Sequence, residues 1–346
     1  MAKTAPAQRV GILTAGGDCP GINAAIRGVG KTVMVKYGMK VIGISDGFTG
    51  MITKEYRELS EKDLSGILTL GGTILGTSRE KPFKTTTGKK NEISKPVLIR
   101  EHYDQMGLDC LVCIGGNGTL KTAHLLSEEG LNIIGIPKTI DNDVWGTDYT
   151  FGFDSAVNIA TEAIDRLHST ANSHKRIMVI ELMGHNAGWI ALYSGVAGGG
   201  DVILIPEIEY KEEKIAEYLL HRAEDNKPYS IVVVAEGIRN PEKDRSVAQY
   251  LSRKITEMTG LETRETVLGY IQRGGSPSPM DRVLATRYGT AAADMIAQRD
   301  FGKMVALKNN KIESVPLAEV SGKLKLVEPD NPLVSYAQNM GTSFGS

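Results

Sequence analysis

IIGIPKTIDND, residues 133–143, begins as a short β-branched run and ends in two carboxylates, Asp141 and Asp143. A run closed by Gly and Pro is typical of a buried strand, so both carboxylates are expected just beyond its carboxyl end. In open α/β sheets that end is where ligands bind. If residues 141–143 stay extended, both side chains point the same way, which is unfavourable unless a cation or a proton lies between them. The stretch therefore indicates a divalent metal and a phosphate at a sheet edge, with a solvated Asx turn as the alternative.

Short apolar runs that end in glycine, each followed by a helical pattern, recur along the chain and predict βα units around parallel sheets. Strands are expected at residues 9–14, 41–44, 110–114, 133–136, 176–181, 202–205, 231–235, 266–268 and near 305. Helices are expected after Asn23 and Asp154, each as a cap, and near 186–196, 212–225, 244–259 and 281–299. A chain of 346 residues exceeds the usual size of one core, so two domains are expected.

Composition limits the classes of function. With 41% hydrophobic and 23% charged residues the chain is typical of a globular protein, and its formal net charge of -1 gives no general attraction to nucleic acid or to anionic membranes. Neither is expected as a partner. Residues 1–8 lack the apolar core of a signal peptide and no run of about 18 apolar residues follows, which predicts a cytoplasmic protein. Cys19, Cys110 and Cys113 fit a reducing compartment, and Cys110 and Cys113 are expected to be structural because they would face opposite sides of a strand.

Glycine clusters follow several of the expected strands, at residues 16–17, 71–72 with 76, and 115–118. Glycine lets the backbone present bare amides, and a following helix adds its positive end, so such loops favour phosphate. None matches the Walker pattern, and each alone is more typical of a turn. Arginines stand at loop boundaries: Arg79, Arg176, Arg273 and Arg282. Beside glycine turns they are expected to bind phosphate, with surface charge as the alternative.

In order, these motifs resemble the 6-phosphofructokinase family: Gly16–Asn23, Gly71–Thr73 with Arg79, Gly115–Thr119, Pro137–Asp143, Gly146–Thr150, Met183–His185 and Gly269–Pro277. The resemblance extends from about residue 9 to 310. It implies transfer of the γ-phosphate of ATP to the 1-hydroxyl of fructose 6-phosphate in glycolysis, giving fructose 1,6-bisphosphate. It also implies two Rossmann-like parallel-sheet α/β domains with the active site in the cleft between them. The phosphate-donor domain would be 1–151 plus 282–334, and the fructose 6-phosphate domain 152–281 plus 335–346.

The resemblance also implies roles for individual residues. Asp141 would be the general base, with Arg79 and Thr139 also catalytic. Sugar-phosphate contacts would come from Thr139, Asp141, Arg176, Met183, Gly184, His185, Glu236, Arg273 and Arg282. Donor contacts would come from Gly16, Arg79, Lys84, Gly116, Asn117, Gly118 and Thr119, and Mg²⁺ would be held by Asn117 and Asp143. Arg176 and Arg273 would reach the 6-phosphate of a neighbouring subunit, so a homodimer or homotetramer with shared active sites is expected.

Some positions depart from the familiar family pattern. Gly118 is typical of members that use ATP, whereas Lys138 is typical of those that use pyrophosphate, and His185 follows the pyrophosphate type. Because a carboxylate at 118 would exclude a nucleotide sterically, Gly118 favours ATP, with a pyrophosphate-dependent fructose 6-phosphate 1-phosphotransferase as the alternative. Asn117 stands where the family usually has Asp, so it brings an oxygen but no charge to the metal.

The sequence leaves allosteric control and two further functions open. The effector positions are only partly basic, since Arg27 and Lys31 are present but His168 and Pro228 replace basic residues. The glycine turn at 115–119 also resembles lipid and NAD kinases, and the atypical Asn117 would suit a sugar-phosphate sensor without activity.

Overall fold

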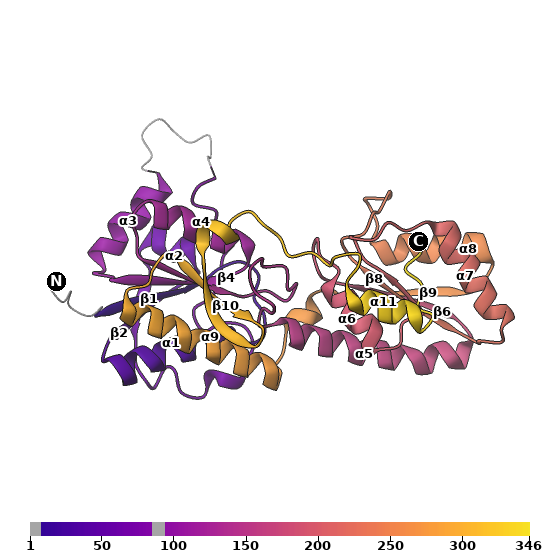
Figure 1. The fold of residues 1–346 in the computed structure, drawn as a ribbon, viewed down its shortest axis with the longest axis horizontal. Coiled ribbons are helices and arrows are strands. Elements are labelled where there is room, and N and C mark those ends of the chain that lie inside the picture. Colours follow the sequence, from indigo (N-terminus) through magenta and orange to yellow (C-terminus); the bar gives the residue numbers. More distant parts are fainter. Residues whose placement is uncertain (1–7, 85–93) are drawn as a thin grey trace. The chain divides into compact units, whose positions relative to one another are not determined.

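The computed structural model describes residues 8–84 and 94–346, and the chain divides into two compact units (Figure 1). Unit 1 takes in the chain up to residue 139 with residues 144–152 and 274–324; unit 2 takes in 140–143, 153–273 and 325–346. The expected segments are 1–151 with 282–334 and 152–281 with 335–346. The units differ from them at two sets of residues: 140–143 and 325–334 belong to unit 2, and 152 and 274–281 belong to unit 1. The substrate assigned to each domain stays a prediction. Residues 1–7, on which the expected lack of a signal peptide rests, lie outside the described residues.

Within the described residues, unit 1 is built on a seven-stranded sheet in the order β11-β10-β5-β4-β1-β2-β3. The strands are β1 (Arg9–Thr14), β2 (Lys40–Ile44), β3 (Tyr56–Leu59), β4 (Cys110–Gly115), β5 (Ile133–Pro137), β10 (Lys303–Lys308) and β11 (Lys311–Pro316). The central strands are parallel, and β3 and β11 pair antiparallel at the two edges. The chain runs from β1 to one edge and from β4 to the other. The point of reversal between β1 and β4 is therefore bordered by the glycine loops that follow these strands.

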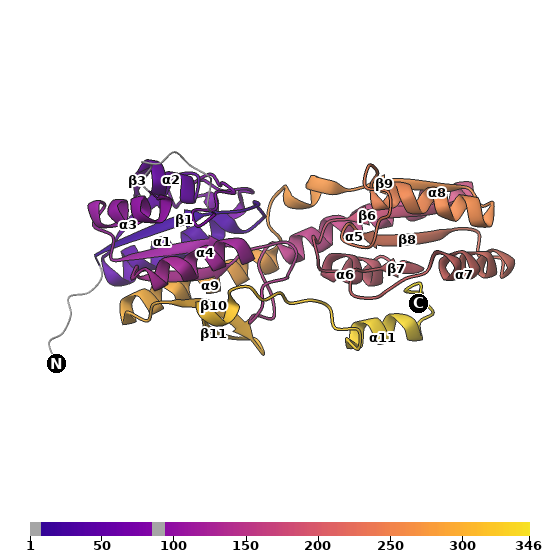
Figure 2. The same cartoon turned by 90° about the horizontal axis from the view of Figure 1, so that it is seen from above.

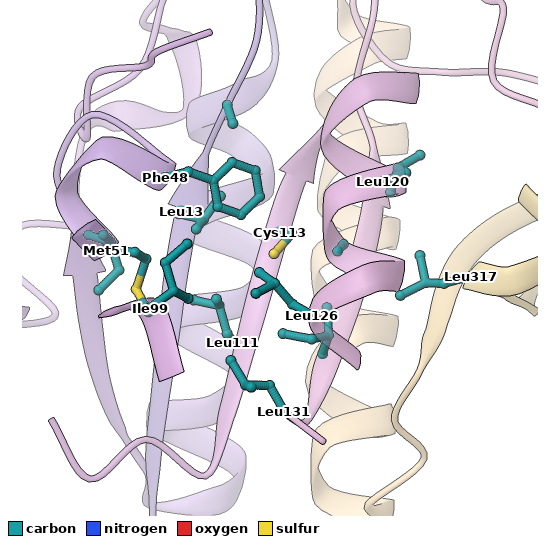
Figure 3. Close-up of a cluster of buried hydrophobic side chains, with 14 of the residues drawn as sticks. Leu13, Phe48, Met51, Ile99, Leu111, Cys113, Leu120, Leu126, Leu131 and Leu317 are labelled. Atoms are coloured by element: carbon teal, nitrogen blue, oxygen red, sulfur yellow. The ribbon is translucent and has the colours of Figure 1, made fainter. Parts of the chain in front are cut away.

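Helices cover both faces of this sheet. They are α1 (Ile22–Tyr37), α2 (Phe48–Thr53), η1 (Ile67–Thr69), α3 (Lys95–Gln105), α4 (Asn117–Glu128), α9 (Pro279–Gln298) and α10 (Leu317–Val320). On one face the core joins Leu111 of β4 to Phe48 of α2 and Leu126 of α4 (Figure 3). On the other face α1 packs closely against α9, where a Cβ on Gly289 would lie 2.6 Å from the Ala25 carbonyl oxygen. These two layers fix the strand ends that carry the loops.

Unit 2 has a smaller sheet, four-stranded over residues 177–267, in the order β7-β8-β6-β9 with parallel pairing throughout (Figure 2). Its strands are β6 (Ile177–Leu182), β7 (Val202–Leu204), β8 (Ser230–Ala235) and β9 (Thr263–Val267). Its helices are α5 (Phe153–His174), α6 (Trp189–Ala197), α7 (Glu212–Glu224), α8 (Val247–Thr259), η2 (Gly269–Arg273) and α11 (Pro332–Asn339). Helix α5 packs on α6, and α7 on α8. The prediction of two parallel-sheet α/β units is confirmed.

Two predicted helix caps are wrong. Helix α1 has Gly21 as its N-cap, and Asn23 lies inside the helix, where its amide holds the loop at residues 70–74. Helix α5 starts at Phe153, so Asp154 lies in its first turn, where a negative charge still favours the helix dipole. Helix α9 starts at Pro279, two residues before the expected Asp281, and is capped by the Ser278 hydroxyl.

Within the described part of the chain the cysteines form no disulfide, and Cys110 and Cys113 are both buried in β4. Burial raises the pKa of both thiols, as expected for structural cysteines rather than a redox pair. Among the helices of residues 8–84 and 94–346, none is long and apolar enough to span a bilayer.

Candidate active site

The loop after β1 is the first candidate for phosphate binding. Gly16 has a φ of 85°, a conformation that favours glycine. Its amide donates to the Ser78 carbonyl at 2.8 Å, and its carbonyl accepts from the Thr77 hydroxyl at 2.7 Å. The Thr14 hydroxyl donates to the Gly76 carbonyl at 2.6 Å. These bonds bring the glycine clusters at 16–17 and 76 into one site.

The loop after β4 leads directly into helix α4. Gly116 is the N-cap residue, and Asn117, Gly118 and Thr119 form the first turn. Their amides are not used within the helix, and together with the helix dipole they favour an anion. A Cβ on Gly118 would meet no described atom within 4 Å. The space beside Gly118 is therefore open, as the ATP hypothesis requires.

Lys138 lies between these two loops. It is 2% exposed, its amide donates to the Gly115 carbonyl at 3.0 Å, and its Nζ donates to the Gly17 carbonyl. A Cβ on Gly16 would lie 3.8 Å from this Nζ and 3.7 Å from the Thr119 Oγ1. The structure thus brings the predicted donor residues Gly16, Thr119 and Lys138 together, with a buried cation among them.

Arg79 directly follows the segment that lies against the β1 loop and is exposed. Among the described residues, its guanidinium makes no ion pair or side-chain hydrogen bond. Lys84 is also exposed, at the end of a described stretch. Arg79 is therefore placed near the glycine loops with its cation uncommitted, whereas the structure gives Lys84 no contact with them.

The loops at residues 71–72 and 274–277 pack side by side in unit 1. A Cβ on Gly71 would lie 2.3 Å from the Gly275 carbonyl oxygen, so only glycine allows this approach. The Ser276 hydroxyl donates to the Thr69 carbonyl at 2.7 Å, and Arg282 donates to Ser276 Oγ at 3.1 Å. Arg282 therefore orders its own loop from the first turn of α9.

In unit 2 the predicted sugar residues gather at the carboxyl ends of β6 and β8. Glu236 follows β8, and its Oε1 accepts from the amides of Gly184 at 3.3 Å and His185 at 2.9 Å. His185 has a φ of 51°, a left-handed conformation that is uncommon for residues other than glycine. The carboxylate of Glu236 therefore holds the Met183–His185 turn in shape, and Met183 is buried at its start.

The Asp141–Asp143 loop begins unit 2 and is buried, but it is not extended. Asn142 has a φ of 51°, so the condition under which both carboxylates would point the same way, an extended backbone at 141–143, is not met. Asn tolerates the left-handed region better than most residues, which explains its place between two carboxylates. Lys325 donates to the Asn142 Oδ1 at 2.9 Å. Thr139, the last residue of unit 1 before this loop, accepts from the Thr150 hydroxyl at 2.7 Å through its carbonyl.

Arg176 lies apart from the other sugar residues of its own chain. It precedes β6, whereas Met183 follows it, and a strand of this length spans about 20 Å. Its guanidinium pairs with Glu262 at 2.8 Å. Arg273 ends η2, beyond the carboxyl end of β9. The structure therefore places Arg176 and Arg273 at opposite ends of the unit 2 sheet.

The family model described as phosphofructokinase matches residues 9–296. The chain belongs to the phosphofructokinase family. A protein of Bacteroides thetaiotaomicron named ATP-dependent 6-phosphofructokinase 3 is 62% identical over 337 residues, which cover 97% of this chain and 100% of that protein. A protein of Amycolatopsis methanolica named pyrophosphate-fructose 6-phosphate 1-phosphotransferase is 48% identical over 339 residues, covering 93% and 97%.

Structures of the family share the same fold. The crystal structure of Pichia pastoris phosphofructokinase in the T-state matches with a TM-score of 0.83 and 33% identity over 98% of this chain. This chain spans only 37% of that longer one. The family resemblance drawn from the motifs is confirmed.

Phosphofructokinase chemistry with Mg²⁺ needs few protein ligands, because this ion keeps several waters and binds largely through substrate phosphates. Asp143 offers a carboxylate and Asn117 an amide oxygen, which suit this hard cation. No group of three or more acidic, His or Cys ligands gathers within residues 8–84 and 94–346. The residues present therefore fit an ion that arrives with its phosphates rather than a closed protein site.

Sequence reasoning missed residues that shape these phosphofructokinase loops from a distance. Asn23 holds the loop at 70–74, and Lys325 holds the Asp141–Asp143 loop. Glu207 ties the start of α6 to Val327 through its carboxylate. Their partners lie far along the chain, so no local pattern could have indicated them.

Proposed function

We propose that the chain is an ATP-dependent 6-phosphofructokinase, which transfers the γ-phosphate of ATP to the 1-hydroxyl of fructose 6-phosphate. The observation that carries the choice of donor is the open space at Gly118, in the first turn of α4. Membership of the phosphofructokinase family and the 62% identical relative with this name support the reaction class.

In this proposal Asp141 takes the proton from the 1-hydroxyl of the sugar. The oxygen of that hydroxyl attacks the γ-phosphorus of ATP, and the bond between this phosphorus and ADP breaks. A positioned base contributes about 10² to 10⁴ in rate. Arg79, with its uncommitted guanidinium, stabilises the charge on the transferring group, and Thr139 orients the sugar. Asp143 and Asn117 would hold Mg²⁺, which would neutralise negative charge on the donor phosphates.

The remaining candidates divide between the two substrates. Gly16, Gly116, Gly118 and Thr119 present backbone and hydroxyl groups to the phosphates of ATP, with Lys138 as an added cation and Lys84 further out. Met183, Gly184, His185, Glu236 and Arg282 contact fructose 6-phosphate. Arg176, at the amino end of β6, would reach the 6-phosphate of a neighbouring subunit in a dimer or tetramer. Arg273, at the carboxyl end of the same sheet, would contact a sugar phosphate at that end, so the two arginines would not serve the same end of one sheet.

One observation favours a second function, the pyrophosphate-dependent transfer to the same sugar. The Nζ of Lys138 is buried at the Gly17 carbonyl, where an ammonium suits a small, highly charged donor. A relative with that function in its name is 48% identical.

Parallel reactions with fructose 6-phosphate, Mg²⁺ and either ATP or pyrophosphate as the sole donor decide between them. We expect fructose 1,6-bisphosphate with ATP only. Product with pyrophosphate only would mean that Lys138 outweighs the open space at Gly118. No product with either donor would favour a sensor or a kinase for another acceptor.

A further inference from the structure

The C-terminal part of unit 2 reaches back to the Asp141–Asp143 loop through one residue, Lys325. Its backbone amide donates to the Asp143 carbonyl at 2.9 Å, and its Nζ donates to the Asn142 Oδ1 at 2.9 Å. Asn142 and Lys325 are 183 positions apart in the chain. The backbone amide and the side chain of Lys325 therefore both donate hydrogen bonds to the Asp141–Asp143 loop.

Lys325 also contacts Trp189 of helix α6. The Trp189 indole Nε1 donates to the Lys325 carbonyl at 2.9 Å, and the Lys325 Nζ lies 5.3 Å from the centre of the Trp189 ring. Two residues later, the Val327 amide donates to Glu207 at 3.0 Å, and Glu207 also accepts from the Gly188 amide at 2.9 Å. Because Gly188 is the N-cap of α6, the segment 325–327 is anchored to a helix rather than to a flexible loop.

The hydrogen bond from Lys325 is made to the residue of this loop that has a left-handed backbone. Asn142 takes a φ of 51°, and it separates the two carboxylates of Asp141 and Asp143. A change in its backbone torsions would turn the carboxylate of Asp141 relative to that of Asp143. A charged donor on its side-chain oxygen resists that change, since hydrogen bonds to an ammonium are stronger than those between neutral groups.

We propose that Lys325 is a positioning residue for phosphoryl transfer, which fixes the direction of Asp141 and Asp143 through Asn142. This inference rests on the proposed function. Lys325 acts through the loop rather than on the sugar or the donor, so its loss should lower turnover more than substrate binding. Misplacement of a reacting group by about 1 Å can cost about 10²-fold in rate.

The experiment compares Lys325→Met with Lys323→Met in the full chain. Lys323 is a matched control because it lies two residues away, with its Nζ 4.2 Å from the centre of the Trp145 ring rather than at the Asp141–Asp143 loop. We expect Lys325→Met to lower kcat by about 10-fold to 100-fold with a KM for fructose 6-phosphate within about twofold. Lys325→Arg should recover part of kcat, and Lys323→Met should match the wild type.

Two further readouts separate positioning from a general loss of structure. The Mg²⁺ concentration for half-maximal rate should rise in Lys325→Met, because Asp143 is turned, while the melting temperature stays near that of Lys325→Arg. Asn142→Ala combined with Lys325→Met should be no slower than the worse single variant, since both changes remove one interaction.

The results that would overturn the positioning role of Lys325 differ from those that would overturn the proposed 6-phosphofructokinase activity. An active wild type with unchanged kcat in Lys325→Met, a raised sugar KM with unchanged kcat, or additive losses in the double variant would each remove the positioning role alone. A wild type inactive with both donors would overturn the proposed function, and this role with it.

Discussion

Gly118 is the residue at which the proposed donor choice can be tested most directly. A carboxylate there would point into the open space beside the first turn of α4, so Gly118→Asp should lower kcat/KM for ATP by at least about 10²-fold through steric and charge repulsion. Gly118→Ala is the matched control, because a Cβ meets no atom of the described residues within 4 Å, and it should keep activity within about threefold. Steady-state kinetics with ATP measure both, and unchanged kinetics in Gly118→Asp would contradict the assigned donor site.

Asp141 is the residue on which the chemical step depends. Asp141→Asn keeps the shape but removes the base, so kcat should fall at least about 10²-fold while fructose 6-phosphate still binds. Turnover assays and calorimetric titration of the sugar measure the two effects. Asp330→Asn, an exposed carboxylate in the same unit, serves as control and should leave both unchanged. If Asp141→Asn turned over at the wild-type rate, another group would have to be the base.

At the scale of elements, β6 and α8 are joined through a buried carboxylate. Glu181 Oε2 accepts from the Ala248 amide at 2.8 Å, in the first turn of α8. Burial raises the pKa of Glu181, and the hydrogen bond from Ala248 opposes that rise only in part. The folded state therefore holds this proton more tightly than the unfolded chain does.

The raised pKa of Glu181 predicts a pH dependence of stability with a definite sign. Its contribution is fully present below the ordinary pKa of a glutamate and is lost as pH rises through the higher folded pKa. Melting temperatures from about pH 4 to 7 should thus fall more with pH in the wild type than in Glu181→Gln. Glu257→Gln on α8 is the matched control with the opposite sign, because the Arg253 hydrogen bond lowers the pKa of Glu257. The prediction would be contradicted if the melting temperature of the wild type rose with pH relative to that of Glu181→Gln.

Elements differ in how well the sequence predicts them, and the cause is burial. Strands β1, β4 and β5 are buried along their length, so continuous apolar runs closed by glycine locate them within about a residue. Strand β9, with the sequence Thr-Arg-Glu-Thr-Val, is half exposed at an edge, and its predicted start lies three residues late. Edge strands β3 and β11 carry charged residues and escape prediction, because their partners rather than their own pattern define them.

For the whole molecule, the glycine loops at 16–17 and 115–118 and the carboxylates Asp141 and Asp143 could be predicted because each follows a parallel strand. The expectation that the glycines at 71–72 also follow a strand is wrong, because they follow η1. What could not be predicted depends on contacts between distant segments. The left-handed Asn142 and its bond to Lys325 are one case, and the grouping of residues 140–143 with unit 2 while 144–152 belong to unit 1 is another. Neither leaves a local pattern, because the sequence records the residues but not which of them meet.

Arg176 precedes β6, whereas the Met183 turn follows this strand. Arg176 therefore lies too far away to contact a sugar phosphate bound at the Met183 turn of its own chain. If it serves a neighbouring subunit, Arg176→Ala should raise the KM for fructose 6-phosphate at least about tenfold through loss of a charge-assisted phosphate contact. Arg166→Ala is the matched control, since Arg166 is an exposed arginine of α5 that pairs with Glu162 and has no proposed role. It should leave that KM unchanged.

Mixing two impaired variants then tests whether sites are shared, with activity measured at a fructose 6-phosphate concentration well below the wild-type KM, where both variants are slow. Equal amounts of Asp141→Asn and Arg176→Ala subunits, refolded together, should form hybrids in which one site has an intact Asp141 and an intact Arg176 from different chains. Random pairing in a dimer with two-fold symmetry makes about a quarter of all sites intact, so about a quarter of the wild-type activity should return. If both residues of a site came from one chain, no intact site could form on mixing and the mixture would stay as inactive as its components.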